Sequence, residues 1–141
     1  METGKKTIIS IETLVNIPVE KVWEFWTKPE HIMQWTQASD DWHAPYADND
    51  LRVGGKFKTT MAAKDGSFSF DFEGSYTSVD YYKVIAYEIE DERRVEILFE
   101  QQGDNTKIIE TFEAEEMNSI EMQRDGWQSI LNNFKKYAEA N

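Results

Sequence analysis

The sequence predicts an α+β domain in which a curved antiparallel sheet wraps a long C-terminal helix and leaves an apolar pocket between them. Strand-like alternation broken by turn residues fills residues 52–114, and the apolar spacing becomes helical after about residue 119. An apolar sheet face needs a second layer, and a terminal helix of similar length supplies it. Because a helix is only about 10 Å wide, it leaves a gap toward one end of a concave sheet.

Length and composition limit the classes of protein to consider. A chain of 141 residues fits a single domain over 1–141. The absence of Cys excludes disulfides, thiolate zinc sites and a cysteine nucleophile. Lys+Arg 15 against Asp+Glu 27 gives a net charge of −12, which repels nucleic acid and anionic membranes. With a polar N-terminus and no apolar run of about 18 residues, we expect a cytoplasmic protein without membrane contact.

The N-terminal third predicts one strand and two short helices. Residues 7–17 alternate as a strand, and Pro18 suits the first turn of a helix. Thr27 and Glu30 have capping-box spacing, so a second helix should begin there and end near Trp35. The first helix has one apolar face, formed by Val19, Val22, Trp23 and Trp26.

The middle of the chain predicts the sheet. Residues 36–51 should be mostly loop, with a short strand around 42–44. The remaining strands are expected at 52–63, 67–79, 83–89, 93–101 and 105–114. Asp65-Gly66 is a hairpin turn signal. One strand face carries Phe68, Phe70, Phe72, Gly74 and Tyr76, and the expected bending points are Gly54, Gly55 and Gly74.

The C-terminal helix is expected over about 119–139, capped by Asn118 or Ser119. Its apolar stripe consists of Ile120, Trp127, Ile130, Leu131, Phe134, Tyr137 and Ala138. Gly126 lies inside the helix at a cost of about 1 kcal/mol relative to Ala. A glycine there indicates close packing or space that is kept open.

A series of short motifs runs along nearly the whole chain. They are Ile17–Trp23, Pro29-Glu30, Trp35, Asp50–Phe57, Asp65-Gly66, Phe70–Tyr76, Thr111–Glu115 and Gly126–Leu131. In this order the chain resembles the START-like, helix-grip (SRPBCC) superfamily, and within it the homologues of the activator of the heat-shock protein 90 ATPase. The resemblance implies a seven-stranded sheet around the C-terminal helix, with two short helices after the first strand and an internal cavity. Relatives of this shape bind lipids, polyketides or hormones, and a few cyclise or hydrate polyketides.

The candidate ligand-binding residues lie on the faces expected to line the pocket, or at its mouth. They are Trp35, Trp42, His43, Phe57, Met61, Phe70, Phe72, Tyr76, Phe99, Glu110, Phe112, Trp127 and Leu131. The alternative is that the apolar members form an ordinary core. Trp35 and Trp42 flank the expected mouth, where they either gate a ligand or cover the end of the core.

Glu110 is the candidate acid or base. Its alternation with Ile108 and Phe112 places it inside, where burial would raise its pKa. Alternatively Ile109 marks the buried face and Glu110 is solvated, which is the interpretation we favour.

Other polar residues do not form a recognisable site in the sequence. His31 is expected to be exposed, and two distant histidines do not supply a metal site, so we expect no metal and no cofactor. Arg52 with Gly54-Gly55 lacks the spacing of a phosphate-binding loop.

These observations favour a module that binds a small hydrophobic or aromatic molecule of unknown identity, without catalysis. One alternative is a chaperone-accessory or other protein-interaction domain, which rests on the resemblance alone. Chaperone contact is not expected, because the co-chaperones carry a separate N-terminal domain that this sequence does not contain. Another alternative is a polyketide cyclase or hydratase-like enzyme, with Glu110 or His43 moving protons. The sequence does not decide whether the protein forms a homodimer.

Overall fold

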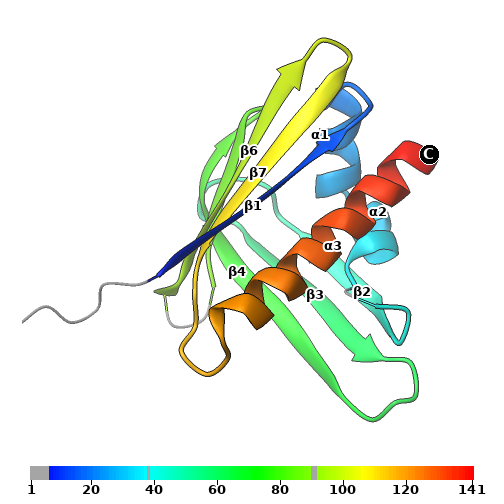
Figure 1. Ribbon diagram of the computed structural model, residues 1–141, viewed down its shortest axis with the longest axis vertical. Helices are drawn as coiled ribbons and strands as arrows, with labels where there is room; N and C mark the ends of the chain where they lie inside the picture. The colour runs from blue at the N-terminus through cyan, green and yellow to red at the C-terminus, as the bar shows by residue number, and fades with distance from the viewer. Residues whose placement is uncertain (1–6, 38, 90–91) are drawn as a thin grey trace, which may run out of the picture.

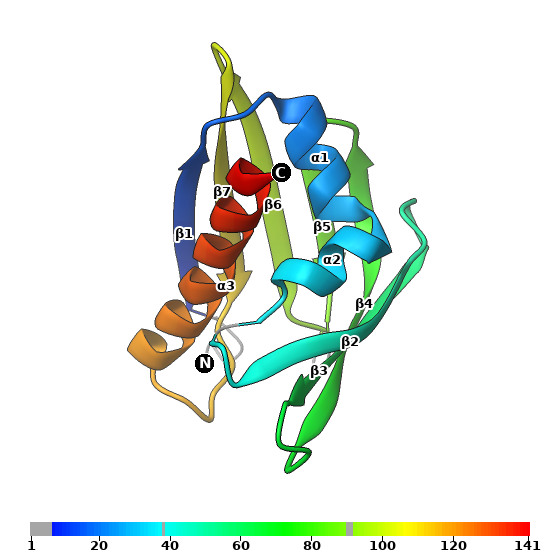
Figure 2. The same cartoon turned by 90° about the vertical axis from the view of Figure 1, so that its right-hand side faces the viewer.

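The structure is a computed structural model that describes residues 7–37, 39–89 and 92–141. Its elements follow the chain as β1 (Ile8–Val15), α1 (Val19–Thr27), α2 (Pro29–Trp35), β2 (Trp42–Asn49), β3 (Lys56–Ala63), β4 (Ser69–Asp80), β5 (Val84–Glu88), β6 (Arg94–Gln102), β7 (Asn105–Glu113) and α3 (Ile120–Ala140). The described residues form a seven-stranded sheet in the order β1-β7-β6-β5-β4-β3-β2. The sheet curls around α3, with α1 and α2 beside the C-terminal part of that helix (Figures 1 and 2). The predicted α+β helix-grip fold is confirmed.

Every pair of neighbouring strands is antiparallel. The first strand pairs with the last, so that Ile9 lies opposite Phe112 and Ile11 opposite Glu110. This pairing brings β1 next to α3 and leaves β1 and β2 as the two edges of the sheet. The register of β4 against β5 shifts between Tyr76 and Ser78. Such a bulge increases the local bend of a sheet.

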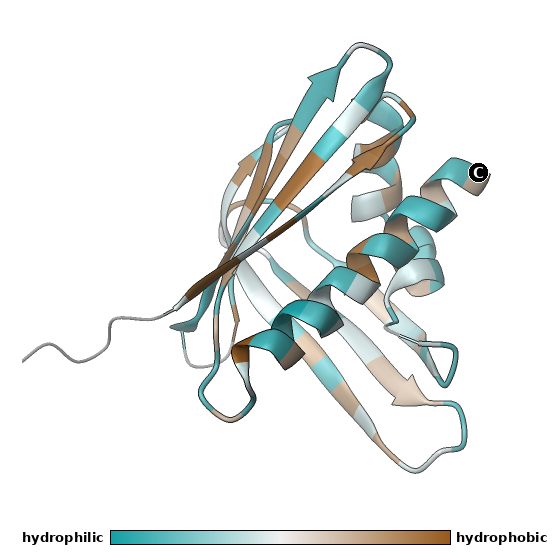
Figure 3. Ribbon diagram, viewed as in Figure 1, coloured by the Kyte–Doolittle hydropathy of each residue, from teal (hydrophilic) through white to brown (hydrophobic). Residues whose placement is uncertain are grey.

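The core lies where β1, β6 and β7 face α1 and α3. Figure 3 shows hydrophobic residues in these strands next to hydrophilic ones along the same strands. The side chains buried most completely include Ile9, Val15, Val22, Ile97, Ile108, Phe112, Leu131 and Phe134. The alternating residues of the strands and the apolar stripe of α3 therefore share one interior, as expected for a two-layer packing.

Gly74 permits a close approach within the sheet. A Cβ atom at this position would lie 2.6 Å from the carbonyl oxygen of Glu88 and 2.7 Å from the ring of Phe57. Only a residue without a side chain allows the Phe57 ring to lie this near the backbone of β4.

Three local predictions were wrong. The strand expected around 42–44 extends over Trp42–Asn49, because it pairs with β3 along most of its length. β3 begins at Lys56 and not at residue 52, since Gly54 adopts a positive φ of 85° within a turn. The Thr27 capping box does not form: Lys28 is the N-cap of α2, and the Thr27 hydroxyl donates to the carbonyl oxygen of Trp23. At α3, Ser119 is the cap and accepts a hydrogen bond from the backbone N–H of Met122.

Within the described ranges, no helix combines the length and apolarity needed to cross a membrane.

A candidate ligand pocket between the sheet and the C-terminal helix

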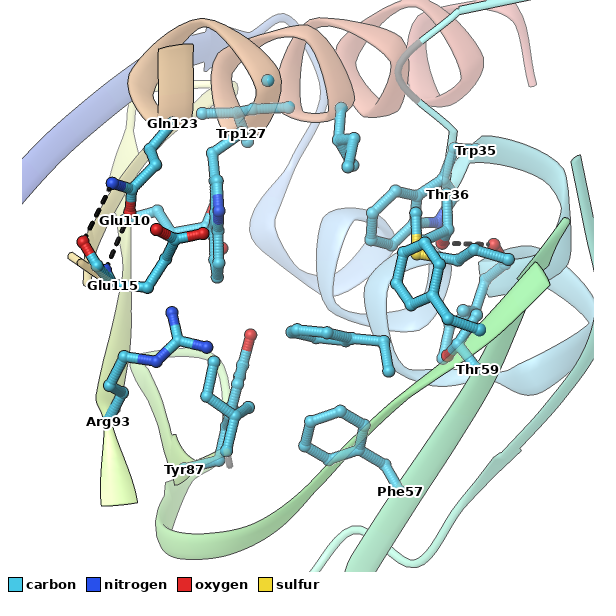
Figure 4. Close-up of a pocket in the computed structure, with 18 of the residues that line it drawn as sticks. Trp35, Thr36, Phe57, Thr59, Tyr87, Arg93, Glu110, Glu115, Gln123 and Trp127 are labelled. Carbon is cyan, nitrogen blue, oxygen red and sulfur yellow. Dashed lines mark hydrogen bonds between the residues drawn. The ribbon is translucent and has the colours of Figure 1, made fainter. Parts of the chain in front are cut away.

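A pocket of about 450 Å³ lies between the concave face of the sheet and α3 (Figure 4). The wall from α3 is formed by Met122, Gln123, Gly126, Trp127, Ile130 and Leu131. The wall from the sheet is formed by Phe57, Thr59, Met61, Phe70, Phe72, Tyr76, Ile85, Tyr87 and Glu110. The two short helices and the loops contribute Trp26, Ile32, Trp35, Thr36, Ile89, Arg93, Glu115 and Asn118.

Gly126 and Trp127 explain how the pocket stays open beside α3. Nothing lies within 4 Å of the position that a Cβ atom of Gly126 would occupy. Trp127 instead stacks on Phe112 of β7, with ring centroids 4.0 Å apart and planes at 12°. Trp127 therefore fixes this part of the helix to β7, next to a residue that leaves space unfilled. Of the two roles expected for Gly126, the structure shows the open space.

Aromatic contacts fix the apolar lining. The Phe57 ring lies 4.7 Å from Tyr87 and 5.3 Å from Tyr76 between centroids. Trp35 donates its indole N–H to the carbonyl oxygen of Phe25 at 2.9 Å, so its only polar atom is satisfied while its ring lines the pocket. The Tyr76 hydroxyl donates to the side-chain oxygen of Asn49. Both hydrogen bonds go to residues outside the pocket lining, and they hold the rings of Trp35 and Tyr76 in place.

Glu110 faces the interior, so the favoured prediction of a solvated Glu110 was wrong. Its side chain lines the pocket and the residue is 6% exposed. Burial raises the pKa of Glu110 to about 8. Among the described residues, no hydrogen bond or ion pair reaches this carboxyl. The pKa of the neighbouring Tyr87 is also raised, first by burial and then by Glu110.

Arg93 and Gln123 lie at the same end of the pocket as Glu110 (Figure 4). The Nε atom of Arg93 is buried and has no hydrogen-bond partner in the described part of the chain. The Gln123 amide is fully engaged: it donates to the carbonyl oxygens of Glu115 and Asn118 and accepts from the N–H of Glu115. Gln123 therefore ties the loop before α3 to the helix, and this fixes one end of the pocket.

Nine of the candidate residues line the pocket: Trp35, Phe57, Met61, Phe70, Phe72, Tyr76, Glu110, Trp127 and Leu131. Four others lie elsewhere. Phe112 stacks behind Trp127, and Phe99 packs edge-on against Trp23 and Trp26. Trp42 contacts Phe68 and Phe70 at the β3–β4 hairpin, and His43 is exposed on β2. Trp42 therefore lies beside Phe70 at the pocket without lining it, and His43 is not part of the lining.

The sequence reasoning missed Tyr87 and Arg93. Tyr87 alternates with Ile85 and Ile89 in a predicted strand, and this signal could have found it. Arg93 precedes β6 outside any regular element, where no periodicity indicates direction. His31 is half-buried and hydrogen-bonded through Nδ1 to the Tyr137 hydroxyl at 2.6 Å, so its predicted exposure was wrong. Within 7–37, 39–89 and 92–141, no three His, Asp or Glu side chains are placed to hold a metal ion.

The fold and the pocket define a START-like, helix-grip protein. Residues 16–139 match the family model described as Activator of Hsp90 ATPase homolog 1-like protein, and the chain belongs to this family. No curated protein matches the chain.

Solved structures agree with this assignment. An AHSA1-like protein from Aeromonas hydrophila is 42% identical with a TM-score of 0.90, over 95% of this chain and 93% of that one. A protein from Cytophaga hutchinsonii is 54% identical with a TM-score of 0.82, over 98% of this chain and 94% of that one. A protein from Nitrosomonas europaea has a TM-score of 0.81 at 17% identity, over 98% of this chain and 97% of that one, which shows the fold alone.

Proposed function

We propose that this protein binds a small hydrophobic or aromatic molecule between the sheet and α3. The observation that carries the proposal is a pocket of about 450 Å³ lined mainly by aromatic and aliphatic side chains. Small-molecule pockets typically measure about 300–1,000 Å³ and combine an apolar lining with a few polar groups. This pocket has both properties.

The exposure of the lining supports a binding site over an ordinary core. Phe70 is 42% exposed and Phe72 is half-buried, although both lie on the face of β4 that points toward α3. A ligand that covered these rings would remove apolar surface from water, and this stabilises the complex by about 25 cal/mol for each Å² buried.

The test is ligand binding measured by native mass spectrometry and by thermal shift, using a library of small aromatic compounds. We expect the wild type to bind at least one compound and Gly126→Leu to lose binding, because the new side chain would occupy the open space beside Gly126. Arg124→Leu is the matched control, since it places the same side chain on an exposed part of α3. A folded wild type that binds no compound in the library would contradict the proposal.

Proton transfer by Glu110 is a second candidate function. A carboxyl with a pKa of about 8 inside an apolar pocket is able to donate or accept a proton near neutral pH. Turnover of polyketide-like substrates, with a pH profile that Glu110→Gln abolishes, would support it. We rank this candidate below binding, because binding requires only the pocket, whereas catalysis also requires a substrate whose reacting atom lies at Glu110.

A further inference from the structure

The pocket has one polar end and one apolar end. Figure 4 shows the guanidinium of Arg93, the carboxyl of Glu110 and the hydroxyl of Tyr87 at one end, and Trp35 and Phe57 at the other. All five residues line the same space. One end of a ligand that fills this space therefore contacts polar side chains, and its other end contacts apolar side chains.

Arg93 carries a buried donor that no described residue satisfies, although its charge acts on the Glu115 carboxylate. A guanidinium is always charged and carries only donors, and an unpaired buried donor of this kind is costly. The Nε atom of Arg93 is nevertheless buried without an acceptor among the described residues. The next residue shows the usual arrangement: Arg94 pairs with Glu113 at 3.1 Å. An acceptor that comes with the ligand would satisfy Arg93.

Glu110 and Tyr87 also present donors at this end. Because burial raises the pKa of Glu110 to about 8, its carboxyl is mostly protonated at neutral pH and is able to donate a hydrogen bond. Tyr87 is buried and its pKa is raised, so its hydroxyl keeps its proton. The Glu115 carboxylate at this end already accepts hydrogen bonds from Met117 and Asn118. The three remaining donors favour an anionic acceptor, whereas an ammonium group would be repelled by Arg93.

We propose that the ligand is an amphipathic organic acid, with its carboxylate against Arg93 and Glu110 and its aromatic or aliphatic body against the apolar end. This inference rests on the proposed binding function. The net charge of −12 opposes an anion only weakly. Charges beyond the Debye length of about 8 Å are screened at physiological salt, whereas Arg93 acts at contact distance.

The same arrangement makes binding of the acid depend on pH. The groups around Glu110 at this end of the pocket are Tyr87 on β5, Arg93 before β6, Glu115 after β7, Ile11 on β1, Ile97 on β6, and Trp127 and Gln123 on α3. Of these, Tyr87, Arg93 and Glu115 carry ionisable groups. Burial raises the pKa of Tyr87, and hydrogen bonds from Asn118 lower the pKa of Glu115, so neither changes its charge near the pKa of Glu110. An anion prefers a protonated Glu110. The affinity for the acid should therefore be constant from pH 6 to about 7.5 and fall above pH 8, by up to about tenfold for each pH unit.

Calorimetric titration with three matched probes tests the inference: 2-naphthylacetic acid, 2-(2-naphthyl)ethanol and 2-(2-naphthyl)ethylamine, at pH 7 and pH 9. At pH 7 we expect the acid to bind at least about tenfold more tightly than the alcohol. Arg93→Gln should remove this preference, because it weakens binding of the acid far more than binding of the alcohol. Glu110→Gln should keep binding of the acid and remove its pH dependence. Arg52→Gln and Glu96→Gln are matched controls on exposed residues and should behave as the wild type.

The other possible results distinguish a failure of the acid assignment from a failure of the proposed binding function. Equal binding of the acid and the alcohol would overturn the acid assignment and leave the proposed function standing. Tighter binding of the amine would overturn it as well, and would make Glu110 a counter-ion to a cationic ligand. If none of the three probes binds the folded protein, the acid assignment fails, and the library screen decides separately whether the proposed binding function fails with it.

Discussion

The two halves of the sheet meet the same helix in different ways. In the half formed by β1, β6 and β7, inward side chains are sealed: Ile9 is 1% exposed, and Ile97 and Ile108 are 0% exposed. In the half formed by β3 and β4, Met61 is 9% exposed and Phe70 is 42% exposed. The β3–β4 hairpin extends away from α3 (Figure 1). The first half therefore serves mainly as the core and contributes Glu110 of β7 to the pocket, whereas the second half lines the pocket, although both have alternating apolar strands.

The largest effect is expected from comparing a phenylalanine of the core, Phe134 on α3, with a phenylalanine of the pocket, Phe72 on β4. Phe134→Ala removes a ring that is 0% exposed, and should lower the free energy of unfolding by about 3–5 kcal/mol. Phe72→Ala removes a half-buried ring at the pocket, and should cost less than about half as much. Urea unfolding of both variants measures the difference. Equal losses would show that the pocket half is packed as tightly as the core.

A second prediction concerns stability and pH at the polar end of the pocket. The pKa of Glu110 is about 8 in the folded protein, above the ordinary value of 4.5 in the unfolded chain. Folding therefore favours the protonated form: the stabilisation is fully present below pH 4.5 and is lost as the pH rises toward 8. The free energy of unfolding of Glu110→Gln should gain on the wild type by about 3–4 kcal/mol between pH 5 and pH 8. Urea unfolding at pH 5, 6.5 and 8 checks this, and parallel curves for the two proteins would refute the burial of Glu110.

The smallest changes in the free energy of unfolding are expected from alanine substitutions at two glycines. Gly126→Ala should raise the free energy of unfolding by about 0.5–1 kcal/mol, because a methyl group meets open space and alanine favours the helix. Gly74→Ala should lower it by about 1–3 kcal/mol, because the new atom would meet Glu88 and Phe57. Thermal unfolding of both variants measures the signs. A destabilised Gly126→Ala would mean that α3 packs closely there.

Much of the fold could be predicted from the sequence, because period-2 and helical spacings fix which side chains share a face. The strands around Phe57 and Phe72 and the stripe of α3 follow from these spacings. The face of the sheet on which Glu110 lies could not be assigned from spacing alone. Ile108 and Ile109 are adjacent, and either phase of the strand therefore places one isoleucine inside. The register of β1 against β7, a long-range contact, decides the phase.

The candidate site was harder to predict than the fold. Trp42 and His43 were expected at the mouth, in a short strand within a mostly looped segment. The strand extends over Trp42–Asn49 by pairing with β3, and neither residue lines the pocket. Arg93 lies between two strands, where direction depends on the packing of the whole pocket and not on local spacing. Residue spacing therefore predicts pocket residues that lie in strands and helices, but not those in the loops that connect them.

An NMR titration of the ¹⁵N-labelled protein with 2-(2-naphthyl)ethanol tests the central claim most directly, because it reports which half of the sheet admits an apolar molecule. We predict that signals move at the Gly126 amide and at the indole N–H groups of Trp35 and Trp127, while the amides of Ile9 and Val15 on β1 stay in place. Spectra that do not change, or changes confined to residues outside the β3–β4 half and α3, would contradict the account.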